Sequence, residues 1–116
     1  MHELSLCEDL MDQVLTIAKV HHAEKVVRII VQIGPLSGIE PLLLESAFSI
    51  SRAGTLAEEA EFLTEALPIR VLCNSCGAES EAVVNNHVCG NCGGYNTKLL
   101  SGDELILARV ELENAN

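Results

Sequence analysis

Residues 73–92 read CNSCGAESEAVVNNHVCGNC, and this stretch constrains the fold more than any other part of the chain. It holds two Cys-x-x-Cys pairs, Cys73 with Cys76 and Cys89 with Cys92, separated by twelve residues. Two such pairs joined by a short hairpin can place four thiolates tetrahedrally around one metal ion. Soft sulfur ligands favour zinc or iron over magnesium or calcium. The stretch therefore predicts a small metal-binding module.

The metal of this module is expected to be structural zinc. Four cysteines complete a tetrahedral shell and leave no position open for water. Residues 73–100 are polar and rich in Gly and Asn, so four buried free thiols would lack the apolar surface to form a core by themselves. Gly77 and Gly93 follow the second cysteine of each pair, where glycine permits the positive φ of a tight knuckle. We therefore expect a zinc ribbon.

Two other kinds of four-cysteine domain are alternatives to the structural zinc ribbon: an iron domain and a ribbon that binds nucleic acid. A rubredoxin-like iron domain usually packs several aromatic side chains near its metal, whereas Tyr95 is the only aromatic residue in 73–100. A ribbon that binds nucleic acid needs bases that neutralise phosphates, but Lys98 stands alone there against Glu79 and Glu81. Both alternatives are less favoured.

The sequence on either side of the module predicts two helices and three strands. Apolar residues recur at helical spacing from Leu4 to Ala18, and Ser5 followed by Glu8 reads as a capping box, so the first helix should begin near Leu6. The other expected elements are a β-branched strand KVVRIIVQI at Lys25–Ile33, a helix over Pro41–Ala53, and strands over Ala60–Leu67 and Glu104–Glu113.

These elements predict an α+β fold in which a small three-stranded sheet with two helices carries the zinc ribbon as an insertion. The main domain is expected to comprise residues 1–68 and 101–116, and the zinc ribbon residues 69–100.

Composition and charge exclude some classes of binding partner and favour one cellular compartment. The chain of 116 residues has a net charge of −10, which disfavours nucleic acid and anionic membranes. The sequence shows neither a signal peptide nor an apolar run long enough to span a bilayer. We therefore expect a cytoplasmic protein, where five cysteines point to metal binding and not to disulfides.

The chain begins Met1-His2-Glu3, which offers a second metal site. The free amine, the following amide nitrogen and the His2 imidazole lie within chelating reach of one ion, and Ni(II) and Cu(II) accept such planar nitrogen sets. The fourth ligand could be the amide or the carboxylate of Glu3, or a ligand from outside the chain. Taken alone, a histidine at position 2 is more often a solvated residue near a disordered terminus.

Four segments together resemble the HypA/HybF family of nickel-incorporation proteins for [NiFe]-hydrogenase, and the resemblance covers essentially the whole chain. They are MHELSL at 1–6, IGPLSGIEP at 33–41, the paired cysteine knuckles, and GDEL at 102–105. One departure is that Asn74 and Gly90 stand where family knuckles often have proline. Without proline, the knuckles are expected to be more flexible.

The resemblance implies a nickel-binding domain with an inserted zinc ribbon. It implies Ni(II) as transient cargo held by His2 with Met1 and Glu3, and structural Zn(II) held by Cys73, Cys76, Cys89 and Cys92. It also implies work with the GTPase HypB, delivery to the hydrogenase large-subunit precursor, and in some organisms service to urease.

Other candidate ligands have simpler interpretations. Glu40 could assist nickel, but an acid there more often complements a helix N-terminus. Neighbouring His21 and His22 do not face one direction on a helix, and His87 is favoured as a loop residue because the four-sulfur shell is complete. Cys7 lies on the apolar stripe and is expected in the core.

No nucleophile–base pair, P-loop or Rossmann glycine pattern appears in the sequence, so no enzymatic activity is predicted. A nickel metallochaperone is the favoured function. A zinc-ribbon adaptor that only contacts proteins is the alternative, and an iron electron carrier comes third.

Overall fold

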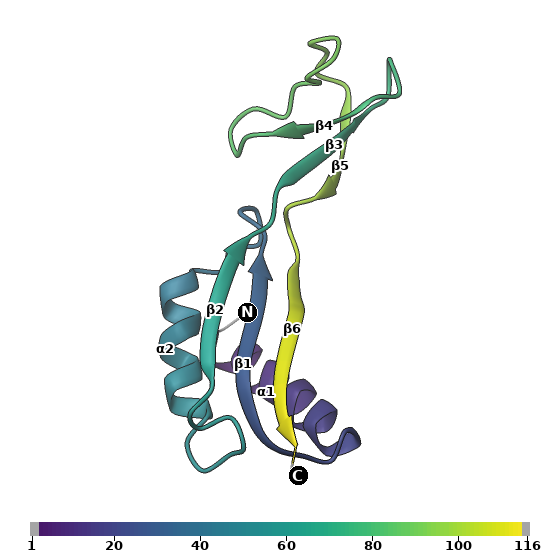
Figure 1. Cartoon of the computed structure of the whole chain (residues 1–116). Helices are drawn as coiled ribbons and strands as arrows, with labels where there is room; N and C mark the ends of the chain where they lie inside the picture. The colour runs from purple at the N-terminus through teal and green to yellow at the C-terminus, as the bar shows by residue number, and fades with distance from the viewer. Residues whose placement is uncertain (1–2, 115–116) are drawn as a thin grey trace. The chain divides into compact units, whose positions relative to one another are not determined.

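The computed structural model describes residues 3–114, which form two helices and two three-stranded sheets (Figure 1). The elements are α1 (Glu3–Val20), β1 (Ala23–Ile33), α2 (Pro41–Ser51), β2 (Glu61–Ala66), β3 (Ile69–Cys73), β4 (Glu79–Ala82), β5 (Thr97–Ser101) and β6 (Leu105–Asn114). The strand orders are β2-β1-β6 and β4-β3-β5. The predicted α+β class, with two helices and a small three-stranded sheet, is confirmed.

The described residues divide into two compact units. The first unit comprises 3–31, 39–65 and 106–114, and the second comprises 32–38 and 66–105. The loop after β1 therefore groups with the cysteine-bearing part of the chain.

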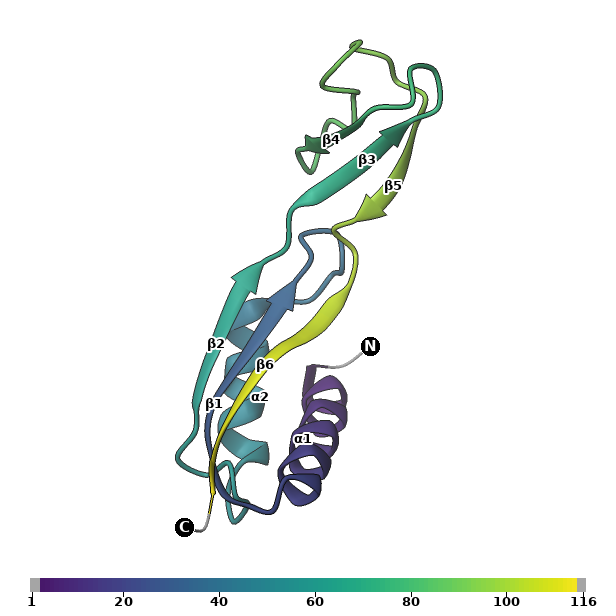
Figure 2. The same cartoon turned by 45° about the vertical axis from the view of Figure 1, so that its right-hand side comes forward.

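The first unit has α1 and α2 on one face of the sheet β2-β1-β6 (Figure 2). The chain passes from β1 through α2 to β2, and these two strands run in the same direction while β6 runs in the opposite one (Figure 1). Ile29 and Val31 of β1 pack into the core with Leu44 of α2 and Val14 of α1, each at most 1% exposed. Burying each such side chain contributes about 1.5–3 kcal/mol.

The predicted start of the first helix was wrong, because α1 begins at Glu3 and not near Leu6. Ser5 and Glu8 therefore lie inside the helix instead of capping it. The longer helix includes Leu4, which lines one depression together with Met11 of α1 and Ile50 at the end of α2. It also places the Glu3 carboxylate in the first turn, where it interacts favourably with the helix dipole.

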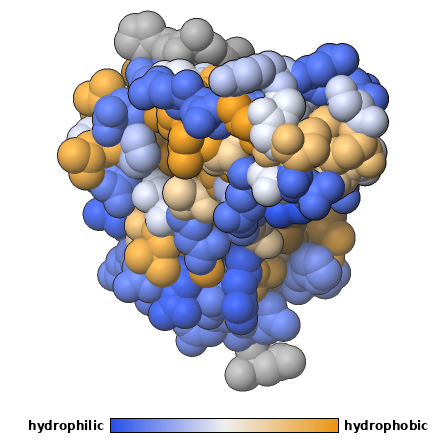
Figure 3. All heavy atoms as spheres, turned by 90° about the horizontal axis from the view of Figure 1, so that it is seen from above, coloured by the Kyte–Doolittle hydropathy of each residue, from blue (hydrophilic) through white to orange (hydrophobic). Residues whose placement is uncertain are grey.

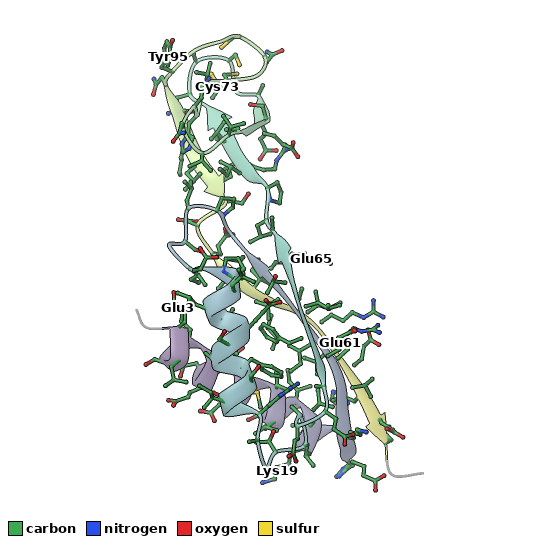
Figure 4. All side chains as sticks on the ribbon, turned by 90° about the vertical axis from the view of Figure 1, so that its left-hand side faces the viewer. Glu3, Lys19, Glu61, Glu65, Cys73 and Tyr95 are labelled. Carbon is green, nitrogen blue, oxygen red and sulfur yellow. The ribbon has the colours of Figure 1, made fainter. Side chains whose placement is uncertain are left out.

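The uncovered face of this sheet carries ion pairs across its strands. Arg28 of β1 donates to Glu61 of β2 at 2.7 Å and to Glu111 of β6 at 3.1 Å. Glu61 points away from the helices (Figure 4). Charges on an open sheet face oppose stacking of one sheet on another.

Figure 3 shows the molecule from above, and on that side hydrophobic side chains lie in separate groups among hydrophilic ones.

The second unit is built on β3, which pairs antiparallel with β4 on one side and β5 on the other. The 32–38 loop of the same unit is joined by backbone hydrogen bonds to the chain around Gly102. Gly34 N–H donates to Glu104 O at 2.8 Å and Leu36 N–H to Gly102 O at 2.7 Å. The backbones approach so closely that only glycine fits at position 34, where a Cβ atom would lie 2.2 Å from Gly102 O.

The Glu104 carboxylate accepts the Gly102 N–H at 2.8 Å, and this bond lowers the pKa of Glu104. Its stabilising contribution is therefore complete above the ordinary glutamate pKa and is lost only as pH falls through the lowered value. We expect a carbon-detected NMR titration of Glu104 to give a midpoint below about 4.3. The Gly102 amide resonance should follow the same curve. A midpoint at or above the ordinary value would contradict this assignment.

Candidate metal centre

The four cysteines of the two Cys-x-x-Cys pairs come together in the second unit. Their Sγ atoms all lie within 4.8 Å of one another. Cys73 Sγ is 3.6 Å from Cys92 Sγ, and Cys76 Sγ is 3.6 Å from Cys89 Sγ. A tetrahedral ion with metal–sulfur bonds of about 2.3 Å would separate its sulfurs by roughly 3.8 Å. The arrangement therefore fits a tetrahedral four-thiolate metal site.

The two knuckles have nearly the same geometry. In the first, the Cys76 N–H donates to Cys73 Sγ at 3.3 Å, and in the second, the Cys92 N–H donates to Cys89 Sγ at 3.4 Å. The glycines after the second cysteines have φ of 75° at Gly77 and 76° at Gly93, as the sequence predicted. These amides point at the sulfurs and stabilise negative charge on them.

The mutual effects of the four thiols on their ionisation favour a cation between them. Amide N–H groups within the knuckles lower the pKa of Cys73, Cys76 and Cys89. The Gly94 amide acts in the same direction on Cys92, but the three neighbouring sulfurs outweigh it and raise the pKa of Cys92 to about 12. A fourth negative charge is unfavourable beside three others unless a cation offsets it. A divalent metal supplies that charge and deprotonates coordinated thiols.

Both knuckle positions that lack proline use a backbone N–H that proline would not have. Asn74 N–H donates to Asn96 O at 2.8 Å, and Gly90 N–H donates to Ser80 Oγ at 3.0 Å. The Asn74 side chain also donates to the side chain of Asn96 at 3.1 Å. These bonds tie the first knuckle to the segment before β5 and the second to β4. They restrain the knuckles by a route other than a proline ring.

Sequence reasoning missed Ser80, Asn96 and Asn91. The Asn91 side chain donates to Cys76 Sγ at 3.6 Å, which links the second knuckle to a sulfur of the first. The absence of proline at positions 74 and 90 was the signal in the sequence that could have indicated them. A residue other than proline has a backbone N–H, and this N–H needs a hydrogen-bond acceptor. Strand pairing determines which acceptors these N–H groups bind.

Figure 4 shows the sulfur atoms gathered near Cys73, with Tyr95 on the surface.

The predicted nickel ligands lie at the start of α1. Met1 and His2 fall outside the described residues, whereas Glu3 is the first residue of the helix and is half-buried. Within residues 3–114, the four-cysteine cluster is the one group of three or more metal-binding side chains. Glu40 is exposed as the N-cap of α2, without a side-chain capping bond. His21 and His22 lie exposed in the turn after α1.

Two remaining candidates lie outside the thiol cluster. Cys7 is fully buried in the first unit, as predicted. His87 is half-buried, and its carbonyl accepts the Thr97 hydroxyl at 2.6 Å. Over the described range 3–114, no helix has the length and apolar character needed to cross a membrane.

Comparison with known proteins assigns the chain to a family. Residues 1–112 match the family model described as "Hydrogenase/urease nickel incorporation, metallochaperone, hypA". Hydrogenase maturation factor HypA of Nitrosospira multiformis is 45% identical over 112 residues, covering 97% of each chain. The factor of the same name from Aquifex aeolicus is 41% identical over 113 residues, covering 97% of this chain and 98% of the relative.

A solved structure supports the same assignment. The solution structure of the Ni metallochaperone HypA from Helicobacter pylori matches with a TM-score of 0.74 at 27% identity, covering 98% of this chain and 99% of the other. The fold, the gathered thiols and the nearly full-length sequence match agree. The chain therefore belongs to the HypA family of hydrogenase and urease nickel-incorporation proteins, which are metallochaperones and not enzymes.

Proposed function

We propose that this protein takes up Ni(II) at its N-terminus and delivers it during maturation of [NiFe]-hydrogenase. The observation that carries the proposal is the family match over residues 1–112, which includes Met1-His2-Glu3. The structural relative described as a Ni metallochaperone supports it. The acidic charge of −10 also suits a protein that attracts cations.

The nickel ligands in this proposal are the Met1 amine, the amide and imidazole of His2, and a fourth donor from Glu3. The amine and the next amide close a five-membered chelate ring, and the amide and imidazole close a six-membered one. Glu3 begins α1, and the N–H groups of the first helical turn have no acceptor within the helix. Metal binding there would therefore not compete with the hydrogen bonds of the helix.

The resident metal in this proposal is Zn(II), held by Cys73, Cys76, Cys89 and Cys92 in the ribbon of residues 69–100. Zn(II) accepts four thiolates tetrahedrally, as the sulfur spacing allows. Its role is to stabilise the second unit. A colourless protein with one zinc per chain would agree with this assignment, whereas a coloured and redox-active one would indicate iron.

The partners follow from the same family role. The GTPase HypB drives transfer, and the hydrogenase large-subunit precursor receives the nickel in the cytoplasm. Urease accessory proteins are a further destination, in keeping with the family description. Nucleic acid and membranes are not partners in this proposal, because acidic residues outnumber basic ones, seventeen to seven.

Nickel binding by native protein and by His2→Ala tests the proposal. Equilibrium dialysis with free N-termini, with zinc measured in the same samples, should show one nickel per wild-type chain in addition to zinc. The His2→Ala variant and a chain whose Met1 amine is acetylated should bind nickel at least about tenfold more weakly with zinc unchanged. Wild-type binding should also weaken as pH falls below about 6.5, because the imidazole must be neutral to bind.

His22→Ala is the matched control, since it removes an exposed histidine in the turn after α1, away from the proposed ligands in the sequence. It should bind nickel like the wild type. Equal nickel uptake by the wild type, His2→Ala and the acetylated chain would refute the N-terminal site and favour the adaptor without nickel transfer.

A further inference from the structure

A groove runs along α1 in the first unit, between this helix and the segment 50–58, which holds the end of α2 and the loop after it. Its first part has a volume of about 360 Å³, lined by Leu4, Glu8, Met11, Asp12 and Leu15 of α1 and by Ile50, Ser51 and Thr55. Its second part, about 750 Å³, shares Leu15 and Thr55 with the first and adds Lys19, His22, Ala23, Gly54, Leu56 and Glu58. We call the two parts together the α1–α2 groove.

The floor of the α1–α2 groove is apolar and partly exposed. Leu4 is 39% exposed, Ile50 70% and Leu56 42%. These side chains belong to different turns of the chain but line one depression, so they differ from the single apolar residues normal on protein surfaces. Leu4, Met11 and Leu15 repeat at helical spacing along α1. Such a surface suits a third helix laid against two others.

The length of the groove defines the length of its occupant. Leu4 and Lys19 are fifteen residues apart on one helix, which at 1.5 Å per residue corresponds to roughly 22 Å. Figure 4 shows α2 alongside α1, with Glu3 and Lys19 at the two ends of α1. A partner helix of about four turns would span the groove.

The charges around the groove indicate which charged side chains the partner helix should carry. Glu8, Asp12 and Glu58 line it against a single base, Lys19. Among the described residues, these three acids have no ion-pair partner. A helix with lysine or arginine beside its apolar stripe would meet them with favourable charge, and an acidic helix would be repelled.

The same charges argue against a second copy of this chain as the occupant. Helix α1 contains four acidic residues and one basic one, and α2 contains Glu45 as its only charged residue. Against the groove of another copy, α1 could offer Lys19 alone among four acids, and α2 could offer no base. The occupant is therefore a different protein.

We propose that the α1–α2 groove is the docking site for a basic amphipathic helix of a partner protein. This inference deepens the proposed function: Leu4 follows Glu3 directly, so a helix bound at that end lies within a few residues of the nickel-binding terminus. Docking would hold the partner beside the metal during transfer. The binding itself does not depend on nickel.

A synthetic helix tests the groove directly. The probe is a fluorescent eighteen-residue amphipathic peptide with leucines on one face and lysines beside them, and its binding to the full-length zinc-loaded protein is followed by anisotropy. The Ile50→Glu variant should bind at least about tenfold more weakly. Leu42→Glu is the matched control, because Leu42 is 69% exposed on the same helix but does not line the groove, and it should change binding less than about twofold.

Charge variants separate the groove from general attraction to an acidic protein. Asp12→Lys should weaken probe binding severalfold, whereas Asp9→Lys, which alters an exposed acid of α1 outside the groove, should have less effect. A peptide with glutamates in place of its lysines should not bind. Added salt should weaken binding of the lysine peptide, because exposed charges are screened over about 8 Å at physiological ionic strength.

Three results would overturn the docking site. They are equal weakening by Ile50→Glu and Leu42→Glu, equal binding of the acidic peptide, and a wild-type dimer in sedimentation that Ile50→Glu dissociates. Failure of the docking site can be told apart from failure of the nickel site. The His2→Ala variant should still bind the peptide, and the Ile50→Glu variant should still bind nickel. Amide spectra of each variant show whether it is folded.

Discussion

Replacing Cys89 with serine is expected to release the metal from the second unit and to unfold that unit, while the first unit stays folded. Cys89 is 2% exposed and Cys73 1%, so two of the proposed ligands are themselves part of the small buried core of this unit, beside Ile69 and Val71. A structural zinc contributes about 10–16 kcal/mol to folds of this kind. So few buried apolar side chains cannot replace that contribution.

Zinc content by elemental analysis and amide resonances of residues 69–101 measure this result. Cys89→Ser should retain well under one zinc per chain and lose resonance dispersion in that range. Cys7→Ser makes the same chemical change at a buried cysteine of the first unit, and it should keep its zinc while lowering the stability of that unit. A Cys89→Ser protein with full zinc and dispersed resonances would mean that this thiol does not hold the metal.

Gly34→Ala is the second substitution with a large expected effect. A Cβ at this position would lie 2.2 Å from Gly102 O and 2.8 Å from Asp103 N, and both atoms belong to the backbone. Relief requires the two chain segments to separate, which would stretch the hydrogen bond from Gly34 N–H to Glu104 O. We expect a loss of about 3 kcal/mol or more in the free energy of unfolding of the second unit.

Urea unfolding followed by amide resonances of the 32–38 loop measures this loss in zinc-loaded protein. Gly38→Ala is the control within the same loop. Gly38 has φ of +78° and nothing within 4 Å of an added Cβ, so its substitution carries only the conformational cost of about 1–2 kcal/mol. If Gly34→Ala destabilised the protein no more than Gly38→Ala, the close backbone approach would not be the cause.

The proposed docking site and the proposed nickel site meet at the start of α1. Glu3, one of the proposed nickel ligands, is the first residue of α1 and directly precedes Leu4 of the α1–α2 groove. A partner helix docked at that end would therefore lie next to the proposed nickel site.

The sequence by itself determined the features that depend on local spacing. The two Cys-x-x-Cys pairs with a following glycine predicted two knuckles, and Gly77 and Gly93 take the expected positive φ. The β-branched run from Lys25 predicted β1, and the apolar stripe of α1 placed Cys7 in the core. In each case the deciding interactions join residues a few positions apart.

Only the tertiary structure decided the features that join distant parts of the chain. Helix α1 begins at Glu3, so the local capping motif at Ser5 misplaced its start. The N–H groups of Asn74 and Gly90 find their acceptors through strand pairing, and the need for glycine at position 34 comes from a backbone segment near Gly102. The groove likewise exists only because two helices separated in sequence lie side by side. Sequence spacing constrains neighbours along the chain, whereas the positions of distant segments follow from how the whole chain buries its apolar surface.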